Sequence, residues 1–209
     1  GGATTQTNRA VLTGQETSVV AEGTDDPMGS TIAGTDGVRT LTQCVKPASR
    51  GVIALPATAD TQLKIVNPDA SEAAIDLTLY GAEGEIQSLG ARGITLAAYE
   101  ERVIALSVLT KKATPVGVSF QASRGRAAVM AITQTQSSGT AAGPSQLGTS
   151  HLLPGIPARA TSSVVVLANP GETRITANLT AYGTTPAYHP QGGENISVPP
   201  HASVSVSLE

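Results

Sequence analysis

The chain has 209 residues, a formal net charge of −3, one cysteine and no tryptophan. Nucleic-acid binding is excluded because no cluster of Lys and Arg is present to neutralise phosphates. A single cysteine excludes an internal disulfide and a thiolate metal cluster, and no apolar run approaches the ~20 residues of a membrane helix. Charged residues make up 14% and aromatic residues 2% of the chain. Together with abundant Val, Ile and Thr, this balance favours strands around an aliphatic core.

Residues 1–37 are polar and rich in Gly and Thr, and they predict an extended, partly disordered arm. Two apolar patches, residues 10–12 and 18–20, indicate short strands within it. The chain begins with Gly1-Gly2 and has no initial methionine, so we expect a signal peptide or anchor helix upstream. Cys44 is interpreted as a lone, half-buried thiol, and a bridge to a cysteine outside this chain is the alternative.

The sequence contains an internal repeat with a displacement of 102 residues. Asn67-Pro68 recurs as Asn169-Pro170, and Tyr80-Gly81 recurs as Tyr182-Gly183. The segments 94–96 and 104–106 recur as 196–198 and 206–208. A repeat of this length predicts duplicated domains rather than a solenoid.

Alternation of apolar and polar residues predicts that each repeat is built from half-buried antiparallel strands. The pattern occurs at 73–80 and 175–182, at 104–108 and 204–208, and at 116–120 and 128–132, with a turn at Arg124-Gly125-Arg126. Strands 63–66 and 164–167 end at Asn-Pro, because proline removes a ladder donor and keeps the preceding residue extended. Tyr-Gly is expected to end the next strand, with glycine at positive φ. Both pairs are interpreted as sheet-edge features.

The expected fold is all-β, with two tandem immunoglobulin-like antiparallel β-sandwich domains and an extended N-terminal arm. The expected boundaries are 1–37 for the arm, 38–135 for the first sandwich, 136–150 for a linker and 151–209 for the second sandwich. A single long sandwich is the alternative architecture. The second repeat ends about two strands before the first one does. We expect that the chain was cut short, that the arm supplies these strands, or that a neighbouring molecule donates them.

The phrases LKIVNPDASEAAIDLTLYGAEG, SSVVVLANPGETRITANLTAYG and GITLAAYEERVIAL resemble an uncharacterised actinobacterial family of secreted proteins, known only as a domain of unknown function. The resemblance covers residues from about 40 to 209. The chain differs in having Asp69 after the first Asn-Pro, where the family has glycine. The resemblance implies duplicated β domains outside the cytoplasmic membrane, and it implies no activity.

A search for chemistry predicts no catalytic, cofactor-binding or metal site. His151, His189 and His201 have no metal-ligand spacing, and no GxSxG nucleophile elbow occurs. The acidic residues Asp25, Asp26, Glu83, Glu85, Glu100 and Glu101 are interpreted as solvated charges in turns, and Asp60, Asp69, Glu72 and Asp76 do not fit an EF-hand.

We therefore expect a non-catalytic structural or interaction protein of the cell envelope, secreted or anchored on the outer face. It would bind another envelope protein through sheet edges or loops, and would meet the membrane only through an upstream anchor. A glycan-binding module that uses Tyr80 and Tyr182 on equivalent strand faces is the alternative. A hydrolase with Glu83, Glu85 or His189 at an inter-domain cleft is the third hypothesis.

Overall fold

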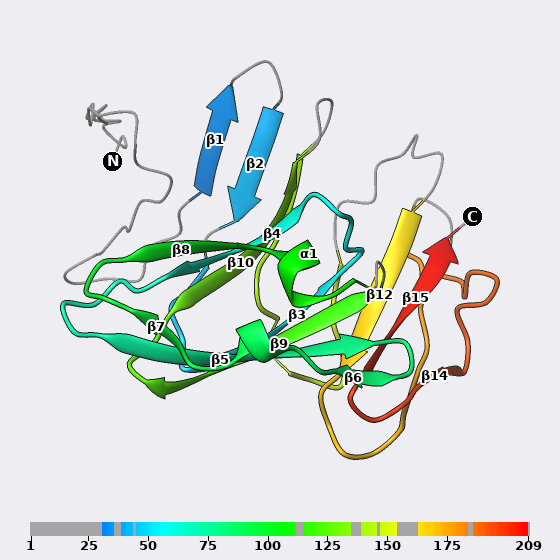
Figure 1. Ribbon diagram of the computed structural model, residues 1–209. Helices are drawn as coiled ribbons and strands as arrows, with labels where there is room; N and C mark the ends of the chain where they lie inside the picture. The colour runs from blue at the N-terminus through cyan, green and yellow to red at the C-terminus, as the bar shows by residue number, and fades with distance from the viewer. Residues whose placement is uncertain are drawn as a thin grey trace.

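The computed structural model describes residues 31–35, 39–43, 45–111, 115–134, 139–145, 147–153, 163–183 and 186–208. Within these ranges the chain is nearly all β, which confirms the predicted class (Figure 1). Strands predicted within residues 1–30, and Cys44, lie outside the described residues. At the N-terminal side, β1 (Thr31–Thr35) and β2 (Arg39–Gln43) form an antiparallel pair.

The first repeat forms two sheets that face each other like a sandwich. One sheet has the order β3-β9-β5-β6, with β7 also paired to β5, and the other has the order β11-β10-β4-β8. In Figure 1 these sheets are the lower and upper layers of the main body. The bounds are β3 (Arg50–Leu55), β4 (Thr61–Val66), β5 (Ala73–Gly81), β6 (Gly84–Ile86), β7 (Ile94–Leu96), β8 (Glu101–Ala105), β9 (Val116–Arg124), β10 (Ala128–Gln134) and β11 (Gly139–Ala142).

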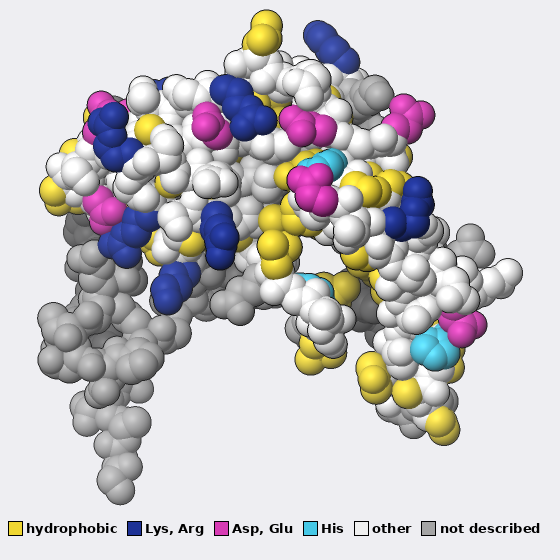
Figure 2. Space-filling view, turned by 90° about the horizontal axis from the view of Figure 1, so that it is seen from below, with side chains coloured by type: hydrophobic (Ala, Val, Ile, Leu, Met, Phe, Trp, Pro, Cys, Tyr) yellow, Lys and Arg dark blue, Asp and Glu magenta, His cyan; other side chains and the backbone are white. Residues whose placement is uncertain are grey.

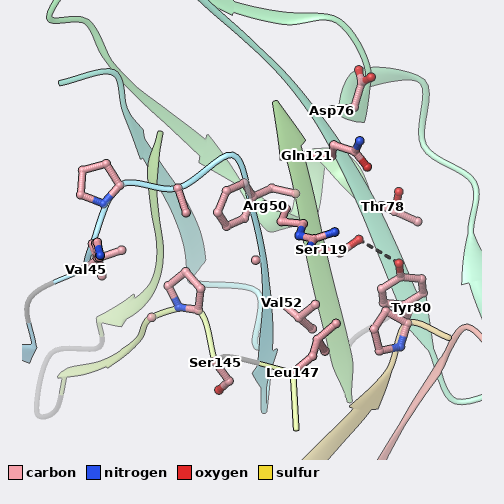
Figure 3. Close-up of a pocket in the computed structure, with 18 of the residues that line it drawn as sticks. Val45, Arg50, Val52, Asp76, Thr78, Tyr80, Ser119, Gln121, Ser145 and Leu147 are labelled. Carbon is pink, nitrogen blue, oxygen red and sulfur yellow. Dashed lines mark hydrogen bonds between the residues drawn. The ribbon is translucent and has the colours of Figure 1, made fainter. Parts of the chain in front are cut away.

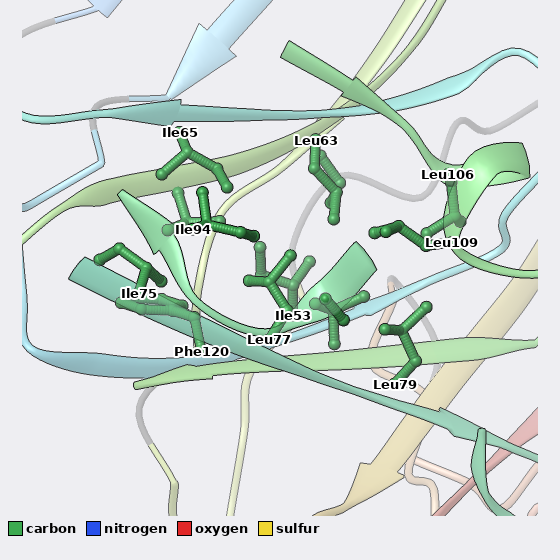
Figure 4. Packing of buried hydrophobic residues seen from close by; sticks show 14 of the residues in the cluster. Ile53, Leu63, Ile65, Ile75, Leu77, Leu79, Ile94, Leu106, Leu109 and Phe120 are labelled. Carbon is green, nitrogen blue, oxygen red and sulfur yellow. The ribbon is translucent and has the colours of Figure 1, made fainter. Parts of the chain in front are cut away.

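The core lies between the two sheets and is almost entirely aliphatic (Figure 4). Period-two alternation places Ile75, Leu77 and Leu79 of β5 inside at 0–1% exposure, while Asp76 and Thr78 point outward. The one phenylalanine, Phe120, lies in the same cluster. The inward phase predicted for β5 and β9 is confirmed. The phase predicted for β10 is wrong, because Val129 and Ala131 are buried whereas Met130 and Ile132 are only partly buried.

Two further local predictions for the first repeat are wrong. The strand expected through Val108 ends at Ala105, and α1 (Leu106–Leu109) follows it. One helical turn buries Leu106 and Leu109 on the same side and leaves Val108 76% exposed. Gly81 does not take positive φ, because it continues β5 and pairs with Gly84, which itself has a φ of 137°. A short 3₁₀ turn, η1 (Leu89–Ala91), lies against α1.

The second repeat reproduces part of this architecture. It contains β12 (Ser163–Asn169) paired with β15 (Ala202–Leu208), and β13 (Ile175–Ala177) paired with β14 (Ile196–Val198). The register is also repeated, since Leu63 faces Ile104 in the first repeat and Val165 faces Val206 in the second. The two repeats therefore share one strand arrangement, with a constant displacement of 102 residues (63 to 165).

The long alternating strand predicted for 175–182 is only partly present. β13 ends at Ala177, and Ile175 is 42% exposed where its equivalent, Ala73, is fully buried. β5 is held along its length by β9, whereas β13 pairs only with β14 in the part of the chain described here. Alternation of apolar and polar residues was therefore not sufficient to extend β13, which has one described partner strand where β5 has several.

The repeated asparagine is buried in both repeats, and its side chain connects separate backbone segments by hydrogen bonds. The Asn67 Nδ2 donates to the carbonyls of Ser71, Leu96 and Ala97 at 2.7, 3.4 and 2.8 Å. Its Oδ1 accepts the Asp69 N–H at 3.1 Å. One side chain thus joins the end of β4, the turn after it and the end of β7, and at 1% exposure it is shielded from water.

Asn169 makes the same four hydrogen bonds 102 residues later. Its Nδ2 donates to the carbonyls of Thr173, Val198 and Pro199 at 2.8, 3.2 and 3.0 Å, and its Oδ1 accepts the Gly171 N–H at 3.0 Å. The Asn-Pro pair is therefore a structural feature, as predicted. The asparagine amide contributes the cross-strand bonding, in addition to the effect of the proline.

The end of β12 and the start of β15 dock on the five-stranded sheet of the first repeat. Ser203 Oγ donates to the carbonyl of Tyr80 at 2.7 Å, and the His201 ring stacks on that of Tyr80 with centroids 6.1 Å apart. A Cβ on Gly117 would lie 2.9 Å from the Cβ of Ala168. Glycine is thus required at position 117 for the close approach of β9 and β12.

We expect Gly117→Ala to weaken this docking by about 1–3 kcal/mol, because the added methyl overlaps Ala168. The matched control is Gly183→Ala, since a Cβ on Gly183 meets no described atom within 4 Å. Chemical unfolding of both variants would measure the difference. Equal stability of the two would contradict the close contact.

Candidate binding groove

An open groove lies on the outer face of the sheet formed by β3, β9 and β5 (Figure 3). Its volume is about 1290 Å³. The sheet forms its floor, and residues 143–145, Leu147 and Pro170 contribute to its walls. Figure 2 shows Lys and Arg side chains on the face seen from below.

Strand register places the polar floor side chains in rows across the sheet. Gln121 of β9 pairs with Arg50 of β3 on one side and with Asp76 of β5 on the other. The next outward-facing row contains Val52, Ser119 and Thr78. Sequence alternation predicts that Asp76, Thr78 and Ser119 point outward, but only the register shows which residues are their neighbours. The sequence search therefore missed the groove.

Tyr80 closes one end of the floor. Its hydroxyl bonds to Ser119 Oγ at 2.8 Å, and docking of the second repeat leaves the residue 4% exposed. The glycan-binding alternative needs Tyr80 to face solvent, and this requirement is not met, because His201 and Ser203 cover the residue. Tyr80 instead lines the end of the groove and contacts the second repeat through His201 and Ser203.

The charge of the lining is predominantly positive. Lys46, Arg50 and Arg92 line the groove, with Asp76 as the only acidic residue of its described lining. Asp76 Oδ1 accepts the Gly93 N–H at 2.7 Å, and Arg92 lies 3.5 Å from Glu85. These cations favour a ligand surface with exposed carboxylates or phosphates.

The wall opposite β5 is fixed by backbone contacts. The Ser145 N–H donates to the Val52 carbonyl at 2.8 Å, so the segment after β11 runs along the free edge of β3. A Cβ on Gly51 would lie 2.6 Å from the Phe120 ring and 2.8 Å from Pro144. The groove is therefore supported by packed core and does not depend on one loop alone.

A second candidate surface is the loop that follows β13. The backbones of Ala181 and Tyr188 exchange two hydrogen bonds, and the His189 ring contacts the Leu179 carbonyl at 2.7 Å. The loop presents Tyr182 and Tyr188 at 77% and 57% exposure. Tyr182, unlike its equivalent Tyr80, faces solvent, so the predicted pair of equivalent tyrosine faces does not form.

Three of the acidic residues considered for catalysis or calcium are engaged in ion pairs, and Asp25 and Asp26 lie outside the described residues. Asp69 forms an ion pair with Arg126, Glu72 forms one with Arg124, and Glu85 forms one with Arg92. Across the described part of the chain, no group of three or more His, Cys, Asp or Glu could hold a metal ion. Glu85 and His189 belong to different repeats, and the described hydrogen bonds do not join them.

Two carboxyl groups have lowered pKa values. The hydrogen bond from Arg126 lowers the pKa of Asp69. The Ala97 N–H, and then Arg102, lower the pKa of Glu100. In each case the charged form is favoured by its donors. Both groups stabilise turns that end strands, and neither lines the groove.

These shifts predict a loss of stability in acid. Because the folded-state pKa of Glu100 lies below its unfolded value, its stabilisation is present above the unfolded pKa and is lost as the pH falls through the folded pKa. Glu100→Gln should therefore show a shallower acid decrease in Tm than the wild type. Glu194→Gln, at an exposed position, should follow the wild type. Identical profiles for all three proteins would contradict the role of Glu100.

Comparison with known proteins gives a match to a protein-family model alone, because neither the curated proteins nor the solved structures give a match. None of the described helices is long and apolar enough to cross a membrane. A family model matches residues 2–166 and again residues 148–209, so that the second match covers the second repeat. The chain therefore belongs to DUF5719, a family of unknown function.

Proposed function

We propose that this protein is a non-catalytic interaction module of the cell envelope, located outside the cytoplasmic membrane. It binds another envelope protein in the groove over β3, β9 and β5. The observation that carries the proposal is a pair of aligned rows in an open groove of about 1290 Å³: the polar row Arg50-Gln121-Asp76, and the row Val52-Ser119-Thr78, in which valine accompanies two hydroxyl groups. Hydroxyl, amide and guanidinium groups at fixed spacing offer directional hydrogen bonds to an extended partner.

Two further features support a protein partner. The groove is open along one face and is large for a small ligand, since such sites are usually enclosed and about 300–1,000 Å³. Its cations Lys46, Arg50 and Arg92 favour a partner segment rich in Asp and Glu. The low charge and the Ser/Thr-rich composition of the whole chain support an extracytoplasmic setting.

The test is capture from an envelope fraction with purified wild type, Gln121→Trp and Gln62→Trp. Gln121 lies on the groove floor, and Gln62 is an exposed glutamine of β4 in the opposite sheet. The indole at position 121 should fill the groove and reduce capture of a partner at least tenfold, while Gln62→Trp captures it as the wild type does. Equal capture by all three proteins would show that the groove is not the binding site. Recovery of the protein together with cytoplasmic markers in cell fractionation would contradict the proposed location outside the cytoplasmic membrane.

The tyrosine loop supports a second candidate function, glycan binding. Exposed aromatic rings provide flat apolar faces with a polar tip, and Tyr182 and Tyr188 lie on one hydrogen-bonded loop. Replacing both with alanine should abolish retention on cell-wall polysaccharide. Tyr99→Asn, at a 70% exposed position in the first repeat, should leave retention unchanged. Retention by the double variant would remove this candidate.

A further inference from the structure

The two ends of the groove over β3, β9 and β5 differ in chemistry. The polar end contains Arg50, Gln121 and Asp76 in one row across the sheet. The opposite end contains Tyr80, at the place where the second repeat docks. Figure 3 shows Gln121 and Asp76 toward the first end, and Leu147 and Tyr80 toward the second. A ligand that occupies the whole groove therefore contacts both a polar and an apolar surface.

The apolar end consists of Val52, Tyr80, Leu147 and Pro170, which all line the groove. Val52 is 8% exposed, whereas Leu147 is 70% exposed. Pro170 follows β12 and belongs to the second repeat, so this end is assembled by the docking of the two repeats. An apolar side chain of a ligand would be stabilised here in proportion to the apolar area that it covers.

The polar end offers a cation that is not neutralised by the described residues. Arg92 is engaged with Glu85, but Arg50 and Lys46 are exposed and form no ion pair in the part of the chain that the structure describes. An arginine binds a carboxylate through two parallel hydrogen bonds, which fixes the position of the acid. Arg50 is therefore suited to bind one carboxylate of a ligand at a defined place.

Strand geometry sets the spacing between the two contacts. Arg50 and Val52 lie in adjacent outward-facing rows, about 7 Å apart along the strand, and Tyr80 lies one row further. Side chains at i and i+2, or at i and i+4, of an extended segment share one face and have the same separations. The groove therefore matches an extended chain with alternating contacts.

We propose that the groove binds an extended protein segment in which an Asp or Glu pairs with Arg50. An apolar side chain, two or four residues away in that segment, packs against Leu147 and Pro170 at the apolar end. This inference rests on the proposed function and adds the sequence pattern that the partner carries.

A protein segment fits the groove better than an anionic polymer does. A polysaccharide or polyphosphate with repeated anions needs cations along its whole path, but the middle row, Val52-Ser119-Thr78, contains none. The hydroxyl groups of this row and the amide of Gln121 can bond to the peptide groups of an extended chain. Asp76 at the polar end also opposes a second anion beside the one bound by Arg50.

Selection of random displayed peptides on the purified full chain tests the pattern. Peptides selected by the wild type should carry an acidic and an aliphatic residue two or four positions apart. Arg50→Gln should select without the acidic preference, and Leu147→Ser should select without the aliphatic preference. The matched controls Arg174→Gln and Leu89→Ser replace an exposed arginine and an exposed leucine outside the groove lining, and they should select as the wild type does.

The affinity of one selected peptide gives the size of each contribution. Its dissociation constant should rise at least about tenfold for Arg50→Gln and for Leu147→Ser, and should be unchanged for the two controls. All four positions are exposed, so the Tm of each variant should equal that of the wild type. A selected pool without the spaced pair, or equal affinities for all five proteins, would overturn the inference.

Two further measurements separate this inference from its alternatives. Polyphosphate binding that is lost in Arg50→Gln but unchanged in Leu147→Ser would assign the groove to an anionic polymer and overturn the inference. An envelope protein captured equally by the wild type and Leu147→Ser, but not by Gln121→Trp, would retain the proposed function and reject the sequence pattern. Equal capture by Gln121→Trp would reject both.

Discussion

Asn67→Asp should destabilise the first repeat by about 3–4 kcal/mol. The substitution keeps the oxygen that accepts the Asp69 N–H but replaces the Nδ2 donor with a second oxygen. That oxygen would face the carbonyls of Ser71, Leu96 and Ala97 in a site 1% exposed to solvent. Chemical unfolding at neutral pH would measure the loss.

A pH series separates this effect from a simple packing defect. The repulsion by three carbonyl oxygens should raise the pKa of the introduced carboxyl, and protonation restores one donor. The destabilisation by Asn67→Asp should thus decrease as the pH is lowered, whereas that by Asn67→Ala should not recover. Asn195→Gly, at a residue with a φ of 54°, should change stability by no more than about 0.5 kcal/mol. A loss of less than about 1 kcal/mol in the free energy of unfolding of Asn67→Asp would contradict the role given to the Asn67 side-chain hydrogen bonds.

Phe120→Ala should lower the free energy of unfolding by about 3–5 kcal/mol, because removal of a fully packed ring leaves a cavity between the sheets. Phe120 is 2% exposed, and its ring occupies the space that a side chain at position 51 would fill, which is free because residue 51 is glycine. Denaturant titration measures the loss. We expect Gly51→Ala alone to cost about 1–3 kcal/mol, since its Cβ would lie 2.6 Å from the ring.

The two positions should be strongly coupled. In a Phe120→Leu background, the smaller side chain removes part of the overlap, and Gly51→Ala should therefore cost less than it does in the wild type. A double-mutant cycle measures this difference. Additive costs would mean that Pro144, 2.8 Å from the same Cβ, is the deciding contact.

The sequence predicted those parts of the fold that depend on local pattern. Alternation in 73–79 and 116–120 identified β5 and β9 with the correct inward faces, because both strands have paired neighbours and a buried side. The same pattern in 175–181 produced only three strand residues, since β13 has a single described partner. The shared landmarks at 67 and 169 correctly identified two repeats with one register.

Long-range contacts could not be predicted in this way. The role of Asn67 depends on the carbonyls of residues 96 and 97, about 30 positions away. The burial of Tyr80 depends on Ser203 and His201, which arrive from the second repeat. The groove rows depend on the register of β9 with both β3 and β5. The predicted location outside the cytoplasm and the domain boundaries stay predictions.

Site-specific photocrosslinking in living cells tests the central claim, that the groove binds an envelope protein. A crosslinker at Gln121 would report on the groove, and one at Val103, 46% exposed on the opposite sheet, would serve as the control. We expect a discrete adduct with an envelope protein from position 121, abolished by charge reversal of Arg50, and no such adduct from position 103. The absence of an adduct at 121, or equal adducts from both positions, would contradict the account.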